Sequence, residues 1–421
     1  MGIVYIPRYA RNTLPLPAQF RLSAIGPAVL LTATSVGAGD ILTGSLAGAE
    51  GGLAVLWAVP AGIVLKWVLT EGIARWQMAT GTTLLEGWVT RLGGWIQWVF
   101  FPYLLLFTLV TSGMLSSACG VAGAALIPLG DLQTSRLIWA AAHSLTALCL
   151  VLFGGYELLK RVLSVCVGAM FFTVVLTAFL LAPDWGAVLQ GFVPSLIPGT
   201  ISWVIGLIGA IGGTMALISY GYWIREEGRT GQEGLRACRA DIFLSYAVIG
   251  LFGVAVVIIG SRVRVRGQGV SLALLLAEQL GNSLGPTGKW LFLVGFWAAV
   301  FSAMLGVWQS LPYLFTDFLS LRRGASAEGV EQSRPYRIYL ACMATIPLLL
   351  VRWPVEKLQL VFGLTGATLL PLLALTLLLM NNRQEWVGRD FRAGAGLNIV
   401  LASALVFFTI VGGREILQLL R

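Results

Sequence analysis

The sequence contains few charged residues. Only 11% of its 421 residues are Asp, Glu, Lys or Arg, whereas 57% are hydrophobic. Soluble domains carry roughly 25% charged residues, so this composition excludes an ordinary soluble domain. It predicts instead an integral membrane protein that crosses the lipid bilayer several times.

Histidine and cysteine are also scarce, which excludes several kinds of site. The single histidine, His143, rules out any site that needs a histidine pair, and the five cysteines show no CxxC spacing. No HExxH motif or nucleophile–base pair is present. We therefore predict that the chain is not an enzyme and needs no cofactor. The net charge of +9 is spread over short loops, so we expect no nucleic-acid partner.

Apolar runs dominate the chain. A membrane span needs about 20 mainly apolar residues. Eleven candidates cover residues 24–49, 53–78, 94–127, 136–154, 158–182, 200–223, 240–261, 288–318, 336–353, 356–381 and 395–418. Because Lys and Arg favour cytoplasmic loops, their distribution predicts a cytoplasmic N-terminus and an external C-terminus. We expect a bacterial inner-membrane protein that is a monomer or weak oligomer.

The first span contains an interruption in the stretch TSVGAGDILT (Thr34–Thr43). Gly37 and Gly39 flank an alanine, and Asp40 follows. In lipid, a helix is broken only where it is buried in protein or lines a wet cavity. An aspartate at mid-membrane is costly unless it is paired or hydrated. The stretch therefore indicates a functional site, although close helix packing also explains glycines in membrane helices.

A second interruption lies five spans later, in IGGTMALISYGYW (Ile211–Trp223). Breaks in the first and sixth spans predict two inverted five-helix repeats with the substrate between the breaks. A single transmembrane domain, residues 1–421, would comprise repeat one (about 24–182), repeat two (about 200–381) and an extra helix (about 395–418). The predicted substrate-binding residues are Gly37, Ala38, Gly39, Asp40, Leu217, Ile218, Ser219 and Tyr220.

Several stretches resemble the Nramp family of divalent-metal transporters. Ile25–Trp57, IGPAVLLTATSVGAGDILTGSLAGAEGGLAVLW, resembles that family's first helix and following turn. Pro183–Pro198, PDWGAVLQGFVPSLIP, resembles the loop before its sixth helix, and Leu369–Arg383, LLPLLALTLLLMNNR, resembles its tenth helix. The resemblance covers most of the chain. It implies an all-α LeuT-type fold of about 11 transmembrane helices, with helices 1 and 6 broken.

The family's signature motifs are altered here. Its first-helix Asp-Pro-Gly-Asn falls on residues 37–40, and its Met-Pro-His falls on Leu217, Ile218 and Ser219. The resemblance thus implies a metal site made by Asp40, carbonyls around Gly37 and Leu217, and Ser219 through water. An oxygen-only site suits a hydrated Mg²⁺ or Mn²⁺ ion.

The resemblance also bears on proton coupling. The acidic residues that the family associates with proton movement fall on Ser117 and Gly120. Obligatory proton coupling is therefore not expected. Two other functions stay open: a carrier of a small organic solute such as an amino acid, and a membrane receptor or scaffold that transports nothing.

Four further charged residues stand in or near the predicted spans. Lys66, deep in the second span, is either a counter-ion for Asp40 or an ammonium that snorkels or binds a carbonyl. Glu71 and Arg75 are i,i+4 neighbours, which predicts a structural ion pair. Asp317, near the inner end of the eighth span, is expected to pair with Arg322 or Arg323.

Overall fold

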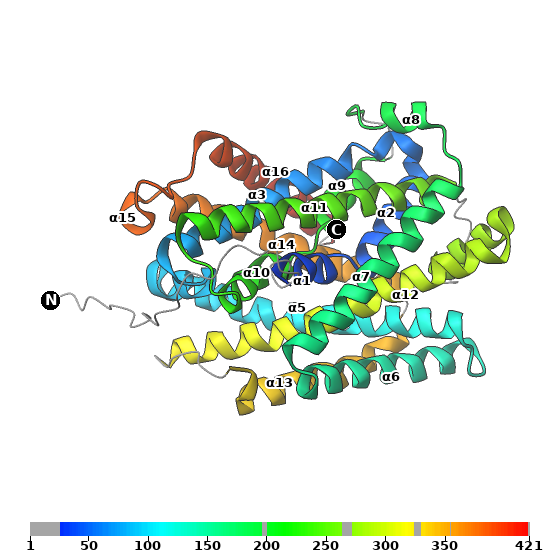
Figure 1. The fold of residues 1–421 in the computed structure, drawn as a ribbon, viewed down its shortest axis with the longest axis horizontal. Helices are drawn as coiled ribbons and strands as arrows, with labels where there is room; N and C mark the ends of the chain where they lie inside the picture. Colours follow the sequence, from blue (N-terminus) through cyan, green and yellow to red (C-terminus); the bar gives the residue numbers. More distant parts are fainter. Residues whose placement is uncertain (1–25, 196–199, 263–271, 324–329, 354, 420–421) are drawn as a thin grey trace, which may run out of the picture.

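The computed structural model describes residues 26–195, 200–262, 272–323, 330–353 and 355–419. These residues form a bundle of helices, and no strand occurs among them (Figure 1). The first half comprises α1 (Gly26–Ser35), α2 (Ala38–Gly51), the 3₁₀ turn η2 (Gly52–Val55), α3 (Ala58–Thr80), α4 (Leu84–Gly87), the π turn η3 (Trp88–Leu92), α5 (Gly94–Leu126), α6 (Leu132–Phe153) and α7 (Gly155–Leu180).

A short helix, α8 (Trp185–Gln190), precedes the second half. That half comprises α9 (Ile201–Ala210), α10 (Met215–Glu226), α11 (Gly231–Ser261), α12 (Leu272–Arg322), the 3₁₀ turn η4 (Val330–Gln332), α13 (Arg334–Thr345), the 3₁₀ segment η5 (Ile346–Arg352) and α14 (Val355–Asn381). The chain continues with α15 (Gln384–Val387) and α16 (Ala395–Leu419). α12 is kinked at Gly285, where φ is 72°.

Among the described residues, seven segments are long and apolar enough to cross a membrane: α5, α6, α7, most of α9–α10, α11, α12 and α14. α1 and α2 together make an eighth, bent by 54° at the break. The remaining predicted spans correspond to α3, to α13 with η5, and to α16. Each of the eleven predicted spans therefore coincides with helical structure.

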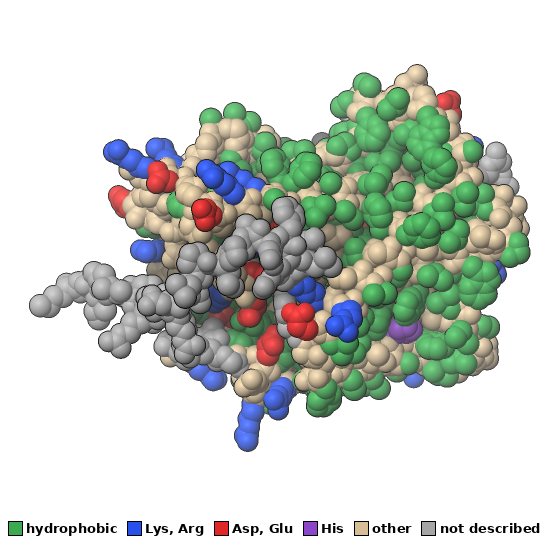
Figure 2. Space-filling view, in the orientation of Figure 1, with side chains coloured by type: hydrophobic (Ala, Val, Ile, Leu, Met, Phe, Trp, Pro, Cys, Tyr) green, Lys and Arg blue, Asp and Glu red, His purple; other side chains and the backbone are tan. Residues whose placement is uncertain are grey.

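Polar and apolar side chains separate on the surface. Hydrophobic side chains cover most of the visible face over α6, α7, α11 and α12, while charged side chains gather toward one end (Figure 2). Ion pairs occur at this end, between Arg225 and Glu86 at 2.7 Å and between Arg229 and Asp241 at 2.6 Å. We call it the charged end of the bundle. The apolar part of this face is the surface expected of a protein surrounded by lipid.

The two interrupted helices lie in the middle of the bundle. Figure 1 shows α1, α10 and α14 between a group containing α3, α9 and α11 and a group containing α5, α6, α12 and α13. Close packing uses small residues: a Cβ on Gly48 of α2 would lie 2.3 Å from the Val257 carbonyl oxygen on α11. These two helices can approach so closely because Gly48 has no side chain.

The breaks themselves also require glycine, through close approach and, in the second break, through backbone conformation as well. In the first, Gly37 is extended between α1 and α2, and a Cβ on it would lie 3.0 Å from the Ala303 Cβ of α12. In the second, Gly212 and Gly213 have φ values of 84° and 64°. A Cβ on Gly213 would also lie 2.9 Å from the Ser35 Cα. Gly213 therefore combines a left-handed backbone with a close approach to the end of α1.

Candidate functional site

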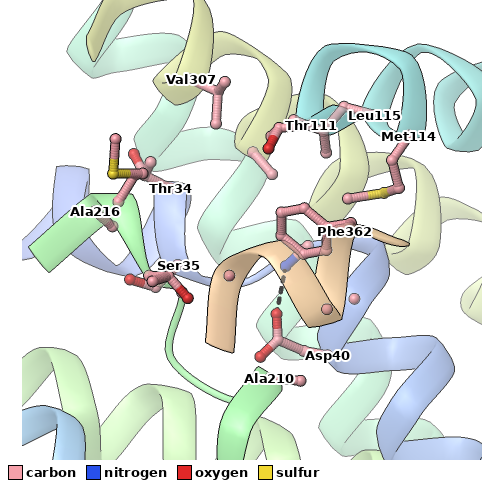
Figure 3. A pocket seen from close by; sticks show the side chains of 18 of the residues that line it. Thr34, Ser35, Asp40, Thr111, Met114, Leu115, Ala210, Ala216, Val307 and Phe362 are labelled. Carbon is pink, nitrogen blue, oxygen red and sulfur yellow. Dashed lines mark hydrogen bonds between the residues drawn. The ribbon is translucent and has the colours of Figure 1, made fainter. Parts of the chain in front are cut away.

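A small cavity lies where the two breaks meet (Figure 3). It is lined by residues of α1, α2, α5, α9, α10, α12 and α14 and by the breaks between the paired helices, and its volume is about 50 Å³. This volume suits a few water molecules or a partly hydrated ion. In this conformation it leaves little space for an organic molecule of several heavy atoms.

Asp40 occupies the first turn of α2 and is 93% buried, with 7% of its surface exposed. Its Oδ2 accepts a hydrogen bond from the Gly37 N–H at 3.0 Å, drawn as the dashed line in Figure 3. Its Oδ1 accepts one from the Gly212 N–H at 3.2 Å. The carboxylate thus caps its own helix, where negative charge is favoured, and also ties the first break to the second.

Lys66 reaches the same second break from α3. Its side chain is fully buried, and its Nζ donates to the Gly209 carbonyl at 3.2 Å and to the Gly213 carbonyl. The structure therefore excludes snorkelling for Lys66 and shows carbonyl binding. The Lys66 and Asp40 charges interact electrostatically, but no Lys66–Asp40 contact within 4.0 Å occurs among the ion pairs of the described residues. The Asp40 carboxylate thus accepts from a backbone N–H at the second break, and the Lys66 ammonium donates to backbone carbonyls there.

Three hydroxyl groups on the cavity wall have no hydrogen-bond partner. They are Thr34 Oγ1 and Ser35 Oγ at the end of α1, and Thr111 Oγ1 on α5. Leaving a buried polar atom unpaired costs about 1–3 kcal/mol. A bound ion or water would satisfy these oxygens. Thr34 and Ser35 belong to the stretch that indicated the first break, but Thr111 stands in an apolar run with no such signal.

Two methionines also line the cavity, Met114 on α5 and Met215 at the start of α10. Figure 3 shows Met114 extending toward Phe362 of α14. The sequence predicted an oxygen-only site because the sixth-helix methionine of the family motif was placed on Leu217. The structure instead provides thioether groups at the cavity wall.

The predicted residues of the sixth span lie beyond the cavity. Leu217, Ile218, Ser219 and Tyr220 are buried in α10 but do not line the cavity. The sixth span lines it through Gly209, Ala210 and residues 213–216. The Ser219 hydroxyl donates to the Met215 carbonyl at 3.1 Å, and the Tyr220 hydroxyl donates to the Cys238 carbonyl at 3.3 Å. The physical reason is that α10 resumes at Met215, so at 1.5 Å per residue these positions lie past the break.

The predicted residues of the first span behave differently. Gly37, Gly39 and Asp40 all line the cavity, whereas the side chain of Ala38 lies outside the described residues. Among the residues that the structure describes, no three His, Cys, Asp or Glu side chains form a group able to hold a metal ion. An ion in this cavity would therefore have Asp40 as its carboxylate, with hydroxyl, carbonyl or thioether groups completing the shell.

Comparison with known proteins identifies relatives over most of the chain. A family model described as natural resistance-associated macrophage protein-like matches residues 28–418. The divalent metal cation transporter MntH of Deinococcus radiodurans is 27% identical over 315 residues, which cover 70% of this chain and 67% of the relative.

Solved structures share the fold. A mutant of the Eremococcus coleocola manganese transporter superposes with a TM-score of 0.74 at 15% identity, covering 95% of this chain and 88% of that chain. MhsT in complex with L-phenylalanine gives a TM-score of 0.59 at 16% identity, covering 92% and 97%. These likenesses confirm the predicted all-α LeuT-type fold. Because the family model spans nearly the whole sequence, the chain belongs to the natural resistance-associated macrophage protein (Nramp) family of integral membrane proteins.

Proposed function

We propose that this protein is a secondary transporter that carries a divalent cation, Mn²⁺ or Mg²⁺, through the cavity between the two broken helices. The observation that carries the proposal is the set of oxygen atoms at the cavity: the Asp40 carboxylate and the unpartnered hydroxyls of Thr34, Ser35 and Thr111. Carboxylate, hydroxyl and water oxygens are the ligands that these ions prefer. The relatives support the same ion class, since they are a divalent metal cation transporter and a manganese transporter.

The geometry favours Mn²⁺ over Mg²⁺. A cavity of about 50 Å³ requires an entering ion to lose part of its hydration shell, and Mg²⁺ gives up water reluctantly. The thioethers of Met114 and Met215 offer little to a hard ion such as Mg²⁺ and favour a transition metal. The small volume and the thioethers therefore both favour Mn²⁺.

We further propose that proton coupling is not obligatory. The third span, α5, contains no Asp or Glu between Gly94 and Leu126. Ser117, one of the two positions where the family resemblance places an acid, instead accepts a hydrogen bond from Arg136 at 3.2 Å. Proton transfer along a span needs groups that bind and release protons near neutral pH, and hydroxyls do not do so.

An organic substrate fits the site less well. A substrate carboxylate would need free backbone N–H groups at the helix start, but the N–H groups of Gly37 and Gly212 already donate to Asp40. The volume of the cavity also disfavours an amino acid.

By analogy with proteins that share this fold, we propose that the N-terminus lies in the cytoplasm and that the protein lies in a bacterial inner membrane.

The test is transport by the full-length protein in liposomes loaded with fluorescent reporters for Mn²⁺, Mg²⁺ and pH. We expect Mn²⁺ uptake, weaker Mg²⁺ uptake and no obligatory pH change. Asp40→Asn should abolish uptake, whereas the matched control Asp184→Asn, at the exposed start of α8, should not. Uptake by Asp40→Asn equal to that of the wild type would overturn the role of Asp40. A purified protein that moves neither ion would favour a receptor or scaffold.

A further inference from the structure

We propose that the Lys66 ammonium is a resident cation: it fills a cation site at the second break, and a small free cation can replace it when the side chain is removed. The site adjoins the substrate cavity: Gly209 and Gly213, whose carbonyls bind Lys66, line the cavity, whereas Lys66 itself does not. The chemical class that the site accepts is a small monovalent cation, a primary alkylammonium above all.

The site is built from backbone carbonyls. Lys66 Nζ donates to the carbonyl oxygens of Gly209 and Gly213. Gly209 belongs to the last turn of α9, where unpaired carbonyls and the helix dipole create partial negative charge. Ends of broken helices with this geometry coordinate cations in membrane transporters. Here the protein's own ammonium takes that position.

The surrounding residues shape a slot for the lysine stem. A Cβ on Gly212 would lie 3.5 Å from the Lys66 Cγ and 3.1 Å from the Tyr246 Cε1. The bare backbone of Gly212 therefore forms one wall. The Tyr246 hydroxyl shares a 2.8 Å hydrogen bond with the Thr70 hydroxyl, one turn after Lys66 on α3. α3 and α11 are thereby fixed beside the break, and Lys66 itself is fully buried.

The resident cation has a consequence for substrate binding. Lys66 and Asp40 bind backbone groups of neighbouring residues in the same break with opposite charges: Lys66 binds the Gly213 carbonyl and Asp40 the Gly212 N–H. Together the two groups are close to neutral, so neither charge is buried without an opposite charge nearby. A divalent cation entering the cavity meets this neutral pair instead of an isolated carboxylate. We infer that Lys66 lowers the affinity of the cavity for divalent cations.

The first experiment tests the cation site without any assumption about the substrate. Lys66→Ala removes the atoms from Cγ to Nζ, which propylammonium reproduces. We expect the melting temperature of purified full-length Lys66→Ala, followed by tryptophan fluorescence, to rise by about 3 °C or more in propylammonium relative to choline at equal ionic strength. The wild type and the exposed-site control Lys289→Met should show no difference between the two salts. Lys66→Met, which fills the slot without charge, should also show none.

The proposal that Lys66 acts as a resident cation would be overturned by either of two results. One is an equal response of all four proteins. The other is a Lys66→Ala protein whose melting temperature is the same in propylammonium as in choline.

The second experiment, Mn²⁺ binding by calorimetry, rests on the proposed function. We expect Lys66→Met to bind Mn²⁺ about tenfold more tightly than the wild type, because a positive charge near the cavity is gone. Unchanged or weaker Mn²⁺ binding would overturn the effect on affinity. Absence of Mn²⁺ binding in both proteins, with propylammonium rescue intact, would contradict the proposed function alone.

Discussion

The Tyr222 hydroxyl donates a 2.6 Å hydrogen bond to Asp317 Oδ2 and so joins α10 to α12. Both side chains are buried, and the ring centroids of Tyr222 and Tyr313 lie 4.7 Å apart. Tyr222 follows Met215 of the cavity wall by about two helical turns, toward the charged end of the bundle. This aromatic pair therefore lies on the side of the cavity toward that end, and the bond to Asp317 holds Tyr222 in place.

Tyr222→Phe should weaken the contact between α10 and α12. The substitution leaves Asp317 buried without its hydroxyl partner, which costs about 1–3 kcal/mol. We expect faster amide hydrogen exchange in α10 and a lower melting temperature. Tyr103→Phe is the matched control, because the buried Tyr103 hydroxyl has no partner and its loss should not destabilise the protein. Exchange in α10 that is the same in both variants would show that the Tyr222–Asp317 bond does not stabilise α10.

The Glu71 carboxylate anchors a second set of contacts at the charged end. It accepts hydrogen bonds from Arg75 at 2.6 Å and from Arg239 of α11 at 2.8 Å. Arg75 also donates to the carbonyls of Phe391 and Arg392 at 3.3 Å, in the segment before α16. One buried acid thus holds α3, α11 and this C-terminal segment together.

Glu71→Gln should be strongly destabilising. Removing one partner of a buried ion pair costs about 3–5 kcal/mol, since the buried arginine then lacks its counter-charge. A fall in melting temperature checks this, with Glu278→Gln as a control at an exposed position of α12. If the two variants melt at the same temperature, the Glu71 cluster contributes little to stability.

Local spacing predicted some of these contacts and not others. The i,i+4 spacing of Glu71 and Arg75 predicted their ion pair, and the structure confirms it. Arg239 could not be predicted, because its contact depends on how α11 packs against α3. The expected partners of Asp317 were wrong for the same reason: its carboxylate meets Tyr222, which comes from α10, instead of the arginines that follow it.

The candidate site, too, was predicted in part from local sequence and in part missed because it depends on packing. Glycines indicated both breaks, and an aspartate at mid-membrane indicated the first. Glycine weakens a helix, and a charged side chain in lipid is costly unless it is paired or hydrated. The cavity wall depends on which helix faces turn inward and where α10 resumes. For that reason Thr111, Met114 and Met215 were missed, and the sixth-span residues were placed past the cavity.

Gly213→Ala should disturb the second break. Its φ of 64° and the 2.9 Å approach of a Cβ to the Ser35 Cα leave no room for a side chain. We expect a loss of about 1–3 kcal/mol in stability, because alanine strains this backbone. Gly206→Ala in α9 is the control, since its Cβ would make an ordinary 3.7 Å contact with Thr43. Equal melting temperatures for the two variants would show that the break tolerates a side chain.

The thioethers at the cavity should decide ion preference. Met114→Leu and Met215→Leu keep the apolar volume but remove sulfur, so a ligand role predicts selective loss of Mn²⁺. We expect Mn²⁺ affinity to fall about tenfold in at least one variant, measured by calorimetry, while any Mg²⁺ binding stays unchanged. Met170→Leu, buried in α7 away from the cavity, controls for packing. Parallel loss of both ions would assign the methionines to shaping the cavity, and no loss of either would leave the oxygen atoms as the sole ligands.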